Sequence, residues 1–137
     1  MRFATITLAA GVAAVGTLAF AAATAPLGPP PPSGAALAEG QCIILRDVGN
    51  HSVVDKNTLL LEAVGKNRGV YRFTMANGCL KSAISSDPIA ISQVSHGGTI
   101  CKARDVTLHG RSGLCAIDSI AKLTPEEAAA LPRKLKP

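Results

Sequence analysis

The cysteines and histidines are the residues of this chain whose types and spacing could carry chemistry. Cys101 and Cys115 bracket His109 in the stretch ICKARDVTLHGRSGLC, which covers residues 100–115. A histidine between two cysteines suits three chemistries: a metal site, a nucleophilic thiol with a base beside it, or a pair of disulfide bridges. The rest of the chain has to show which of these three chemistries applies.

The four cysteines of the chain, Cys42, Cys79, Cys101 and Cys115, predict disulfides. Zinc sites pair cysteines about two residues apart, and no such pair is present, so no metal and no cofactor is predicted. An even number of cysteines in a small exported chain is typical of a disulfide framework. Loop entropy favours Cys42–Cys79 with Cys101–Cys115. A turn at residues 109–113 would put Cys101 and Cys115 out of register, which leaves Cys42–Cys115 open.

The three histidines are weak functional candidates: His51, His96 and His109 all fall in predicted loops. A hydrolase would use one of them as a general base, with a carboxylate such as Glu62 or Asp105 and an arginine for the developing charge. Histidines in glycine-bounded turns are more often solvated. The chain lacks the G-x-S-x-G, H-E-x-x-H and phosphate-loop patterns. No catalytic residue is therefore assigned.

Residues 1–25 have the three-part pattern of a secretory signal peptide. Arg2 is followed by a long uncharged run of Ala, Leu and Val and then by small residues. We expect this segment to form a signal helix, so that the mature protein is periplasmic or extracellular. The alternative is a chain anchored to the inner membrane by residues 3–25, which are long enough to span a bilayer.

Three cleavage positions fit the small-residue rule: after Ala23, after Ala25 and after Ala38. Pro26 disfavours the cut after Ala25, and Ala38 lies far from the apolar run. Residues 26–40 include four consecutive prolines, which favour an extended polyproline conformation. The sequence predicts that residues 26–40 are a disordered spacer.

Composition limits the partner classes. Without Arg2 the chain has thirteen basic and nine acidic residues, a net charge of +4. The basic residues are scattered and aromatic residues are few, whereas nucleic-acid grooves combine dense basic stripes with stacking aromatics. Nucleic acid is not expected as a partner. An envelope protein or a cell-wall component remains, and the membrane is a partner if the N-terminal segment is uncleaved.

The clearest structural pattern is a hairpin. TLLLEAV, residues 58–64, and VYRFTM, residues 70–75, flank a glycine-bounded loop. Alternation places one apolar set on each strand, and these sets are Leu59, Leu61 and Ala63, and Tyr71, Phe73 and Met75. A second hairpin is expected around HGRSG. CIILRDV, residues 42–48, is predicted to be a strand, and residues 49–57 a turn-rich segment.

Residues 41–123 are therefore predicted to form one disulfide-stabilised β domain. We expect an all-β, mainly antiparallel fold: a small barrel or curled sheet of about five or six short strands. Pro88 limits one strand to the residues after it. Residues 124–137 are predicted to be a short helix and a basic tail, because Thr124 and Glu127 form a capping box and Pro132 ends the helix.

An ordered set of short motifs resembles a known group of proteins. The motifs are a cysteine followed by R-D-V, then V-V-D-x-x-T-L-L, V-Y-R, G-C-L, D-P-I and I-C, within residues 41–120. Together they are similar to an uncharacterised family of small exported proteobacterial proteins, a domain of unknown function with cysteine-bearing β-strands. The resemblance implies an envelope location and transfers no activity.

Two functions remain in view. The first is a non-enzymatic binding or structural module of the cell envelope. The second is a small secreted hydrolase that uses a loop histidine as general base. The first is favoured because no acid/base set is evident in the sequence. Convergence of two histidines, or of a histidine and a carboxylate, in one pocket would favour the second.

Overall fold

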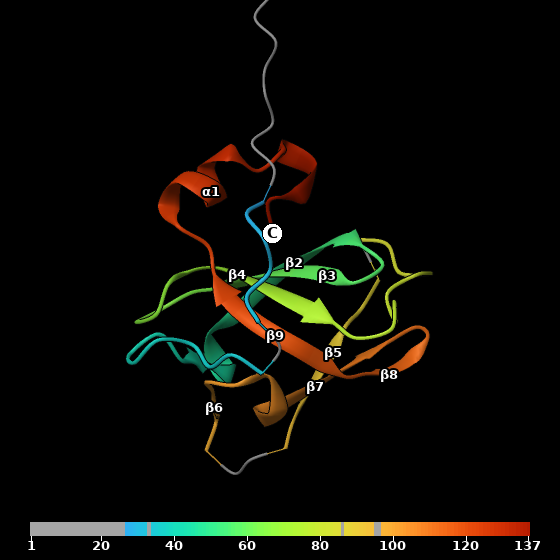
Figure 1. The fold of residues 1–137 in the computed structure, drawn as a ribbon, viewed down its shortest axis with the longest axis horizontal. Helices are drawn as coiled ribbons and strands as arrows, with labels where there is room; N and C mark the ends of the chain where they lie inside the picture. Colours follow the sequence, from blue (N-terminus) through green and yellow to red (C-terminus); the bar gives the residue numbers. More distant parts are fainter. Residues whose placement is uncertain (1–26, 33, 86, 95–96) are drawn as a thin grey trace, which may run out of the picture.

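The computed structural model describes residues 27–32, 34–85, 87–94 and 97–137. The described chain is mainly antiparallel β structure with one short α-helix, as the sequence predicts (Figure 1). The strands are β1 (Ile43–Ile44), β2 (Val48–Asp55), β3 (Thr58–Ala63), β4 (Gly69–Met75), β5 (Ala90–Gln93), β6 (Thr99–Ile100), β7 (Val106–Gly110), β8 (Gly113–Cys115) and β9 (Ile117–Lys122). The described residues thus form nine strands, where about five or six were predicted, and several of the nine are shorter than expected.

The strands form a curled arrangement of three antiparallel sheets that do not close into a barrel. The largest sheet has the order β2-β3-β4-β9, the second has the order β5-β7-β8, and β1 pairs with β6. The predicted hairpin is β3 and β4, in which Leu59 lies opposite Phe73. Both apolar sets of this hairpin face the main core and are at most 3 % exposed.

The other face of the large sheet is covered by the C-terminal segment. Helix α1 (Pro125–Ala130) begins at the predicted capping box, in which Thr124 Oγ1 accepts from the Glu127 amide. The chain continues into a 3-10 turn, η3 (Arg133–Leu135). Leu60 on β3 packs with Leu123 and Leu131 in a second apolar cluster. The basic tail is thus tied to the sheet through its leucines, while its charged residues stay exposed.

The structure corrects two predictions around residues 42–57. CIILRDV is not one strand, because β1 is followed by the 3-10 turn η1 (Leu45–Asp47). The segment expected to be turn-rich is instead most of β2, an eight-residue strand at the edge of the large sheet. Its glycine and asparagine are poor strand formers. Pairing with the strongly apolar β3 overrides that local preference.

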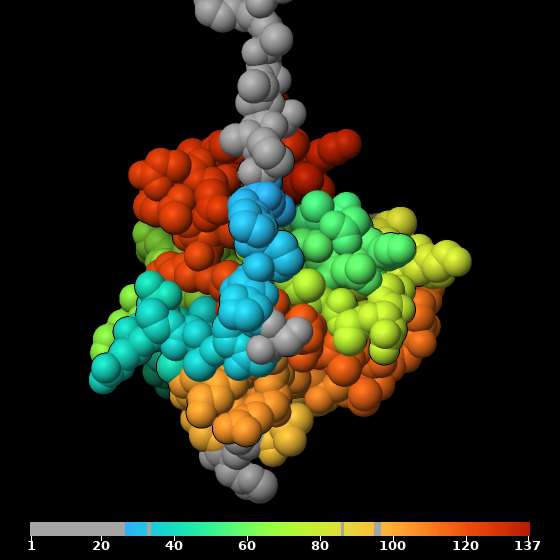
Figure 2. Space-filling model, in the orientation of Figure 1, coloured from blue at the N-terminus to red at the C-terminus, as the bar shows by residue number. Residues whose placement is uncertain are grey.

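The expected disordered spacer packs against the domain. We call residues 27–32 and 34–38 the strap. Figure 2 shows the strap in blue, running over the surface beside the red C-terminal segment. Leu37 is 9 % exposed and belongs to the main core, and Leu27 packs on the second apolar cluster. Prolines prevent regular secondary structure but do not prevent tertiary contacts. The sequence pattern does not show such contacts, so it predicts disorder.

Candidate functional site

The structure answers the question raised by residues 100–115: both cysteines are in disulfides. Cys42 is bonded to Cys101, with Cα atoms 4.4 Å apart, and Cys79 is bonded to Cys115, with Cα atoms 5.7 Å apart. Neither pairing favoured from the sequence is present. Loop entropy could not decide, because doubling a loop's length costs only about 0.6 kcal/mol. Such disulfides fit an oxidising, exported environment.

Strand pairing explains why Cys101 and Cys115 do not meet. Cys115 ends β8 and lies opposite Leu108 of β7, whereas Cys101 directly follows β6, which pairs with β1. The pairing of Ile43 with Ile100 brings Cys42 beside Cys101. The prediction that Cys101 and Cys115 are out of register is therefore correct, whereas the Cys42–Cys115 pairing that it left open is not present.

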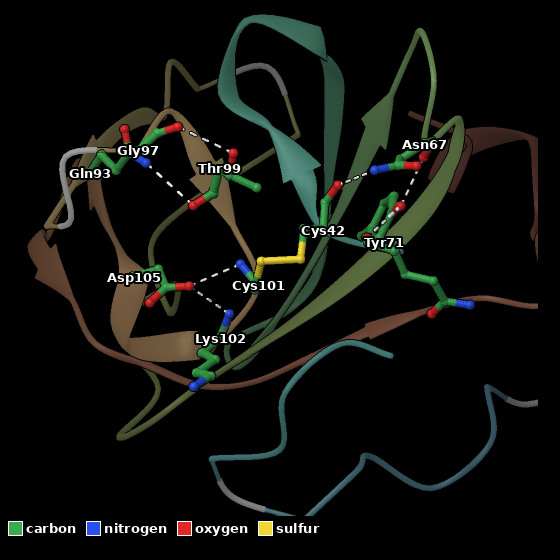
Figure 3. The surroundings of a disulfide bond; sticks show 10 residues. Cys42, Asn67, Tyr71, Gln93, Gly97, Thr99, Cys101, Lys102 and Asp105 are labelled. Atoms are coloured by element: carbon green, nitrogen blue, oxygen red, sulfur yellow. Dashed lines mark hydrogen bonds between the residues drawn. A yellow bond between two sulfur atoms is a disulfide. The ribbon is translucent and has the colours of Figure 1, made fainter. Parts of the chain in front are cut away.

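Polar contacts on both sides hold the Cys42–Cys101 bridge in place (Figure 3). The Asp105 carboxylate accepts hydrogen bonds from the amides of Cys101, at 2.9 Å, and Lys102, at 2.8 Å. On the other side the Asn67 side-chain amide donates to the Cys42 carbonyl. Asp105, a carboxylate considered for hydrolysis, is therefore used to fix the 3-10 turn η2 (Ala103–Asp105).

Tyr71 is a buried polar residue beside the same bridge. Its hydroxyl oxygen lies 2.8 Å from the Asn67 carbonyl oxygen and 3.1 Å from that of Gln41, and its single hydrogen is donated to this pair of acceptors. Desolvation by burial raises the pKa of Tyr71 above its ordinary value of 10.0. A neutral hydroxyl within hydrogen-bond distance of both carbonyls links the β3–β4 loop to the chain before β1, which is a structural role.

His109 lines an open cleft of about 470 Å³, which we call the His109 cleft. Its lining residues are Asp87, Pro88, Ile89, Ala90, His109, Gly110 and Arg111. His109 lies at the end of β7 with its side chain exposed, opposite Ala90 on β5 and Leu114 on β8. A histidine and a carboxylate therefore converge, which is the observation that would favour a hydrolase.

The Asp87 carboxylate in this cleft has a local partner. Asp87 is only 7 % exposed, and its Oδ2 accepts from the Ile84 amide at 3.1 Å, closing a turn before β5. No hydrogen bond joins a histidine to a carboxylate among the described residues. Base catalysis by histidine usually depends on such an orienting bond. The cleft thus brings together an imidazole, a guanidinium and a turn-bound carboxylate.

The other two histidines fall in different places. His51 on β2 is half-buried, and its Nε2 lies 2.9 Å from the Asp87 carbonyl oxygen. This contact links the β2 edge to the segment that leads into β5. His96 lies outside the described residues. His51 therefore contacts the segment that lines one side of the His109 cleft. Asp87 was not predicted as a site residue. Its side-chain partner is the main-chain amide of Ile84 in the same loop, which no sequence motif marks.

The acidic residues of the domain are mostly half-buried: five are half-buried, and Asp87 alone is buried. Of the nine Asp and Glu residues, only Glu39, Asp55 and Glu126 are exposed. Asp87 and Asp105 accept hydrogen bonds from amides, and so do Asp55 and Glu127. These carboxylates stabilise turns and a helix start, so much of the negative charge is engaged within the fold.

The positive charges have the opposite distribution. Eleven of the thirteen Lys and Arg residues after position 26 are exposed: Arg46, Lys56, Lys66, Arg68, Lys81, Lys102, Arg104, Arg111, Arg133, Lys134 and Lys136. Within the described part of the chain the structure records one ion pair, from Arg46 Nε to Asp47 Oδ1 at 3.7 Å. The exposed charges after position 26 are therefore mainly positive, on a segment whose net charge is +4.

Two of the exposed cations meet at a second cleft, of about 510 Å³, which we call the Lys102–Arg104 cleft. Its lining residues are Gly34, Ala36, Lys102, Ala103, Arg104, Ile117 and Asp118. It lies between the strap, η2 and β9, so no single sequence segment contains it. Lys102 and Arg104 are neighbours in the sequence, and the fold brings the strap and β9 beside them to form the hollow.

Within the described residues, no group of three or more His, Cys, Asp or Glu side chains lies close enough together to hold a metal ion. Over the same residues, no helix is long and apolar enough to cross a bilayer. No protein family, curated protein or solved structure was found to match the chain. The resemblance to a family of exported proteins therefore stays a prediction.

Proposed function

We propose that this protein is an exported, non-enzymatic binding module of the cell envelope that recognises anionic groups. The observation that carries the proposal is the uneven exposure of charge: eleven cations are exposed, whereas six of the nine acidic residues are half-buried or buried. Positive surface potential attracts phosphate- or carboxylate-bearing envelope components and raises their association rate. Two disulfides within one small domain are consistent with work outside the cytoplasm.

The Lys102–Arg104 cleft is the proposed contact site. It combines two exposed cations with a hollow of about 510 Å³, enough for a small anionic headgroup or a sugar unit. The guanidinium of Arg104 can bind a phosphate or carboxylate with two parallel hydrogen bonds, and Lys102 adds a point charge. The neighbouring Asp118 would disfavour ligands with dense charge on that side.

The test is a binding measurement on the mature protein. Sedimentation with vesicles that contain an anionic phospholipid should show binding that neutral vesicles do not show and that salt weakens. Polyphosphate serves as the soluble polyanion and distinguishes a headgroup effect from a bilayer effect. Absence of binding to both anions at low salt contradicts the proposal.

A charge-matched pair of variants tests the site. Lys102→Gln with Arg104→Gln should weaken binding about ten- to thirtyfold, since each cation near an anionic surface contributes about 1 kcal/mol. Lys56→Gln with Lys81→Gln removes the same charge from exposed positions elsewhere and should weaken binding less. Equal losses would mean that binding is spread over the surface and is not centred on the cleft.

A hydrolase is the second candidate, and the His109 cleft is the observation that favours it. His109 would act as base and Arg111 would stabilise the developing negative charge. Chromogenic esters, phosphodiesters and glycosides should then be turned over by the wild-type protein and not by the His109→Ala variant. Turnover that survives in His109→Ala, or no turnover at all, contradicts this second candidate.

A further inference from the structure

The strap makes polar contacts through its main-chain carbonyl oxygens. Arg72 on β4 is 7 % exposed, and its guanidinium donates to the carbonyls of Gly28, at 2.5 Å, and Pro29, at 2.8 Å. Prolines have no amide hydrogen, so a proline-rich segment offers mainly carbonyl oxygens. The planar fork of a buried arginine suits two successive carbonyls, and these contacts hold Leu27–Pro32 against the sheet.

The strap also makes apolar contacts at both ends. Leu27 packs on the cluster that contains Leu60, Leu123 and Leu131, on the outer face of the large sheet. Leu37 enters the main core on the other side. Burial of a leucine contributes about 1.5–3 kcal/mol relative to its exposure. The strap therefore adds apolar surface to both cores of the molecule.

Backbone hydrogen bonds fix the middle of the strap. The Gly34 amide donates to the Asp118 carbonyl at 2.8 Å, and Ala36 forms an antiparallel bridge with Lys102. The Leu37 amide donates to the Cys101 carbonyl, also at 2.8 Å, next to the disulfide. The A-L-A sequence that ends at Ala38, one of the three predicted cleavage positions, is therefore part of the folded domain.

From these contacts we infer that processing of the exported chain ends before Leu27, and that residues 27–38 remain as a structural part of the mature domain. This inference rests on the proposed export. A signal peptidase would hydrolyse the peptide bond after Ala23 or Ala25 with one water molecule. The leader then carries the new carboxylate, and the mature chain carries the new amino group. The cut after Ala38 is rejected because it would remove the leucines and carbonyls just described.

A cut after Ala38 would leave the Arg72 guanidinium without the strap carbonyls. Its Nε already has no partner among the described residues. The loss would uncover the apolar cluster on which Leu27 packs and would open the core around Leu37. Both changes reduce stability and increase exposure to proteases.

Expression of the full chain in an exporting bacterial host tests the inference. Intact mass and N-terminal sequencing should give a chain that starts at Thr24 or Pro26. Ala23→Phe changes a small residue that both cuts require and should cause the precursor to accumulate. Ala38→Phe is the matched control at an exposed position and should be processed normally. A mature chain that starts at Glu39, or a block of processing by Ala38→Phe, overturns the inference and leaves export intact.

A stability comparison gives a second, independent readout. A chain that starts at Thr24 should melt at a higher temperature and resist protease longer than a chain that starts at Glu39. Failure of the shorter chain to fold is the extreme form of the same result. Leu37→Ala in the longer chain tests the contact without truncation and should lower the melting temperature. Equal melting temperatures for the two chains overturn the inference, whereas a full chain that retains Met1 contradicts both cleavage and the proposed export.

Discussion

Arg72 is the residue whose role is furthest from what its position in the sequence indicates. It lies on β4 between the core residues Tyr71 and Phe73, on the opposite face, where alternation alone predicts a solvated arginine. The strap covers that face, so the guanidinium is buried and hydrogen-bonded to main-chain carbonyls. A buried charge without a carboxylate partner depends on those hydrogen bonds.

Replacement of Arg72 should therefore be costly. Arg72→Met keeps much of the apolar stem and removes two charge-assisted hydrogen bonds, and we expect a loss of about 1–3 kcal/mol in the free energy of unfolding. Denaturant titration measures it. Arg68→Met, in the exposed β3–β4 loop, is the control and should stay within about 0.5 kcal/mol of wild type. Equal effects of the two variants would refute the structural role of Arg72.

Tyr71 gives a prediction about pH. Because burial raises its pKa, the unfolded chain loses this proton first as the pH rises past 10.0, and the folded state is then disfavoured. The contribution of Tyr71 to stability is thus complete below that pH and is lost above it. The chain has one tyrosine and no tryptophan, so the ultraviolet absorbance of tyrosinate reports Tyr71 alone. In the native protein this signal should appear at higher pH than in guanidinium, and identical titrations would contradict burial.

At the scale of elements, the disulfides add covalent links to the few hydrogen bonds that join the sheets and to the shortest strand pair. Cys79, in the turn after β4, is bonded to Cys115 at the end of β8, and so connects the large sheet to the β5-β7-β8 sheet. Cys42–Cys101 closes the short β1–β6 pair. The three small sheets are not joined to one another by strand pairing, so the disulfides help to keep their relative positions.

Removal of the Cys79–Cys115 bridge should weaken the domain strongly. The bridge spans 36 residues, for which the chain-entropy relation gives about 4 kcal/mol. The Cys79→Ala, Cys115→Ala double variant should lose about that much stability in denaturant titration, provided that it folds. Disulfide mapping of the wild-type protein is the companion measurement. A Cys101–Cys115 peptide pair would contradict the observed connectivity.

At the scale of the whole molecule, charge is divided by function. The carboxylates that accept hydrogen bonds from amides contribute to folding, and the exposed cations are the groups proposed to bind a partner. Substitutions of the two sets should therefore have separable effects on stability and on binding. Such a division is expected for a binding module and is not required of an inert structural domain.

We expect Asp105→Asn to lower stability, because the Asp105 carboxylate accepts from two amides beside a disulfide and an amide group is a weaker acceptor. Its affinity for anionic vesicles should stay the same or rise slightly, because the variant loses one negative charge beside Lys102 and Arg104. Lys102→Gln with Arg104→Gln should do the reverse. Thermal melts and vesicle sedimentation on the same samples separate the two effects, and a parallel loss of stability and binding in both variants would contradict the division.

The sequence by itself determined the features that depend on neighbours along the chain. The β3–β4 hairpin, the buried faces around Leu59 and Phe73, the capping box at Thr124 and the start of β5 after Pro88 follow from alternation, turn residues and caps. The all-β class follows from the same local patterns. The oxidation of all four cysteines follows instead from their even number and from the predicted export.

Only the tertiary structure decided which distant segments meet. Cysteine pairing, the burial of Arg72 under the strap, the His109 cleft and the Lys102–Arg104 cleft all join residues that strand pairing brings together from far along the chain. The physical reason is that loop entropy varies weakly with separation, so it cannot rank such pairings, whereas packing and register can. β2 illustrates the same point within one element, because a segment with poor local propensity becomes a strand once β3 lies beside it.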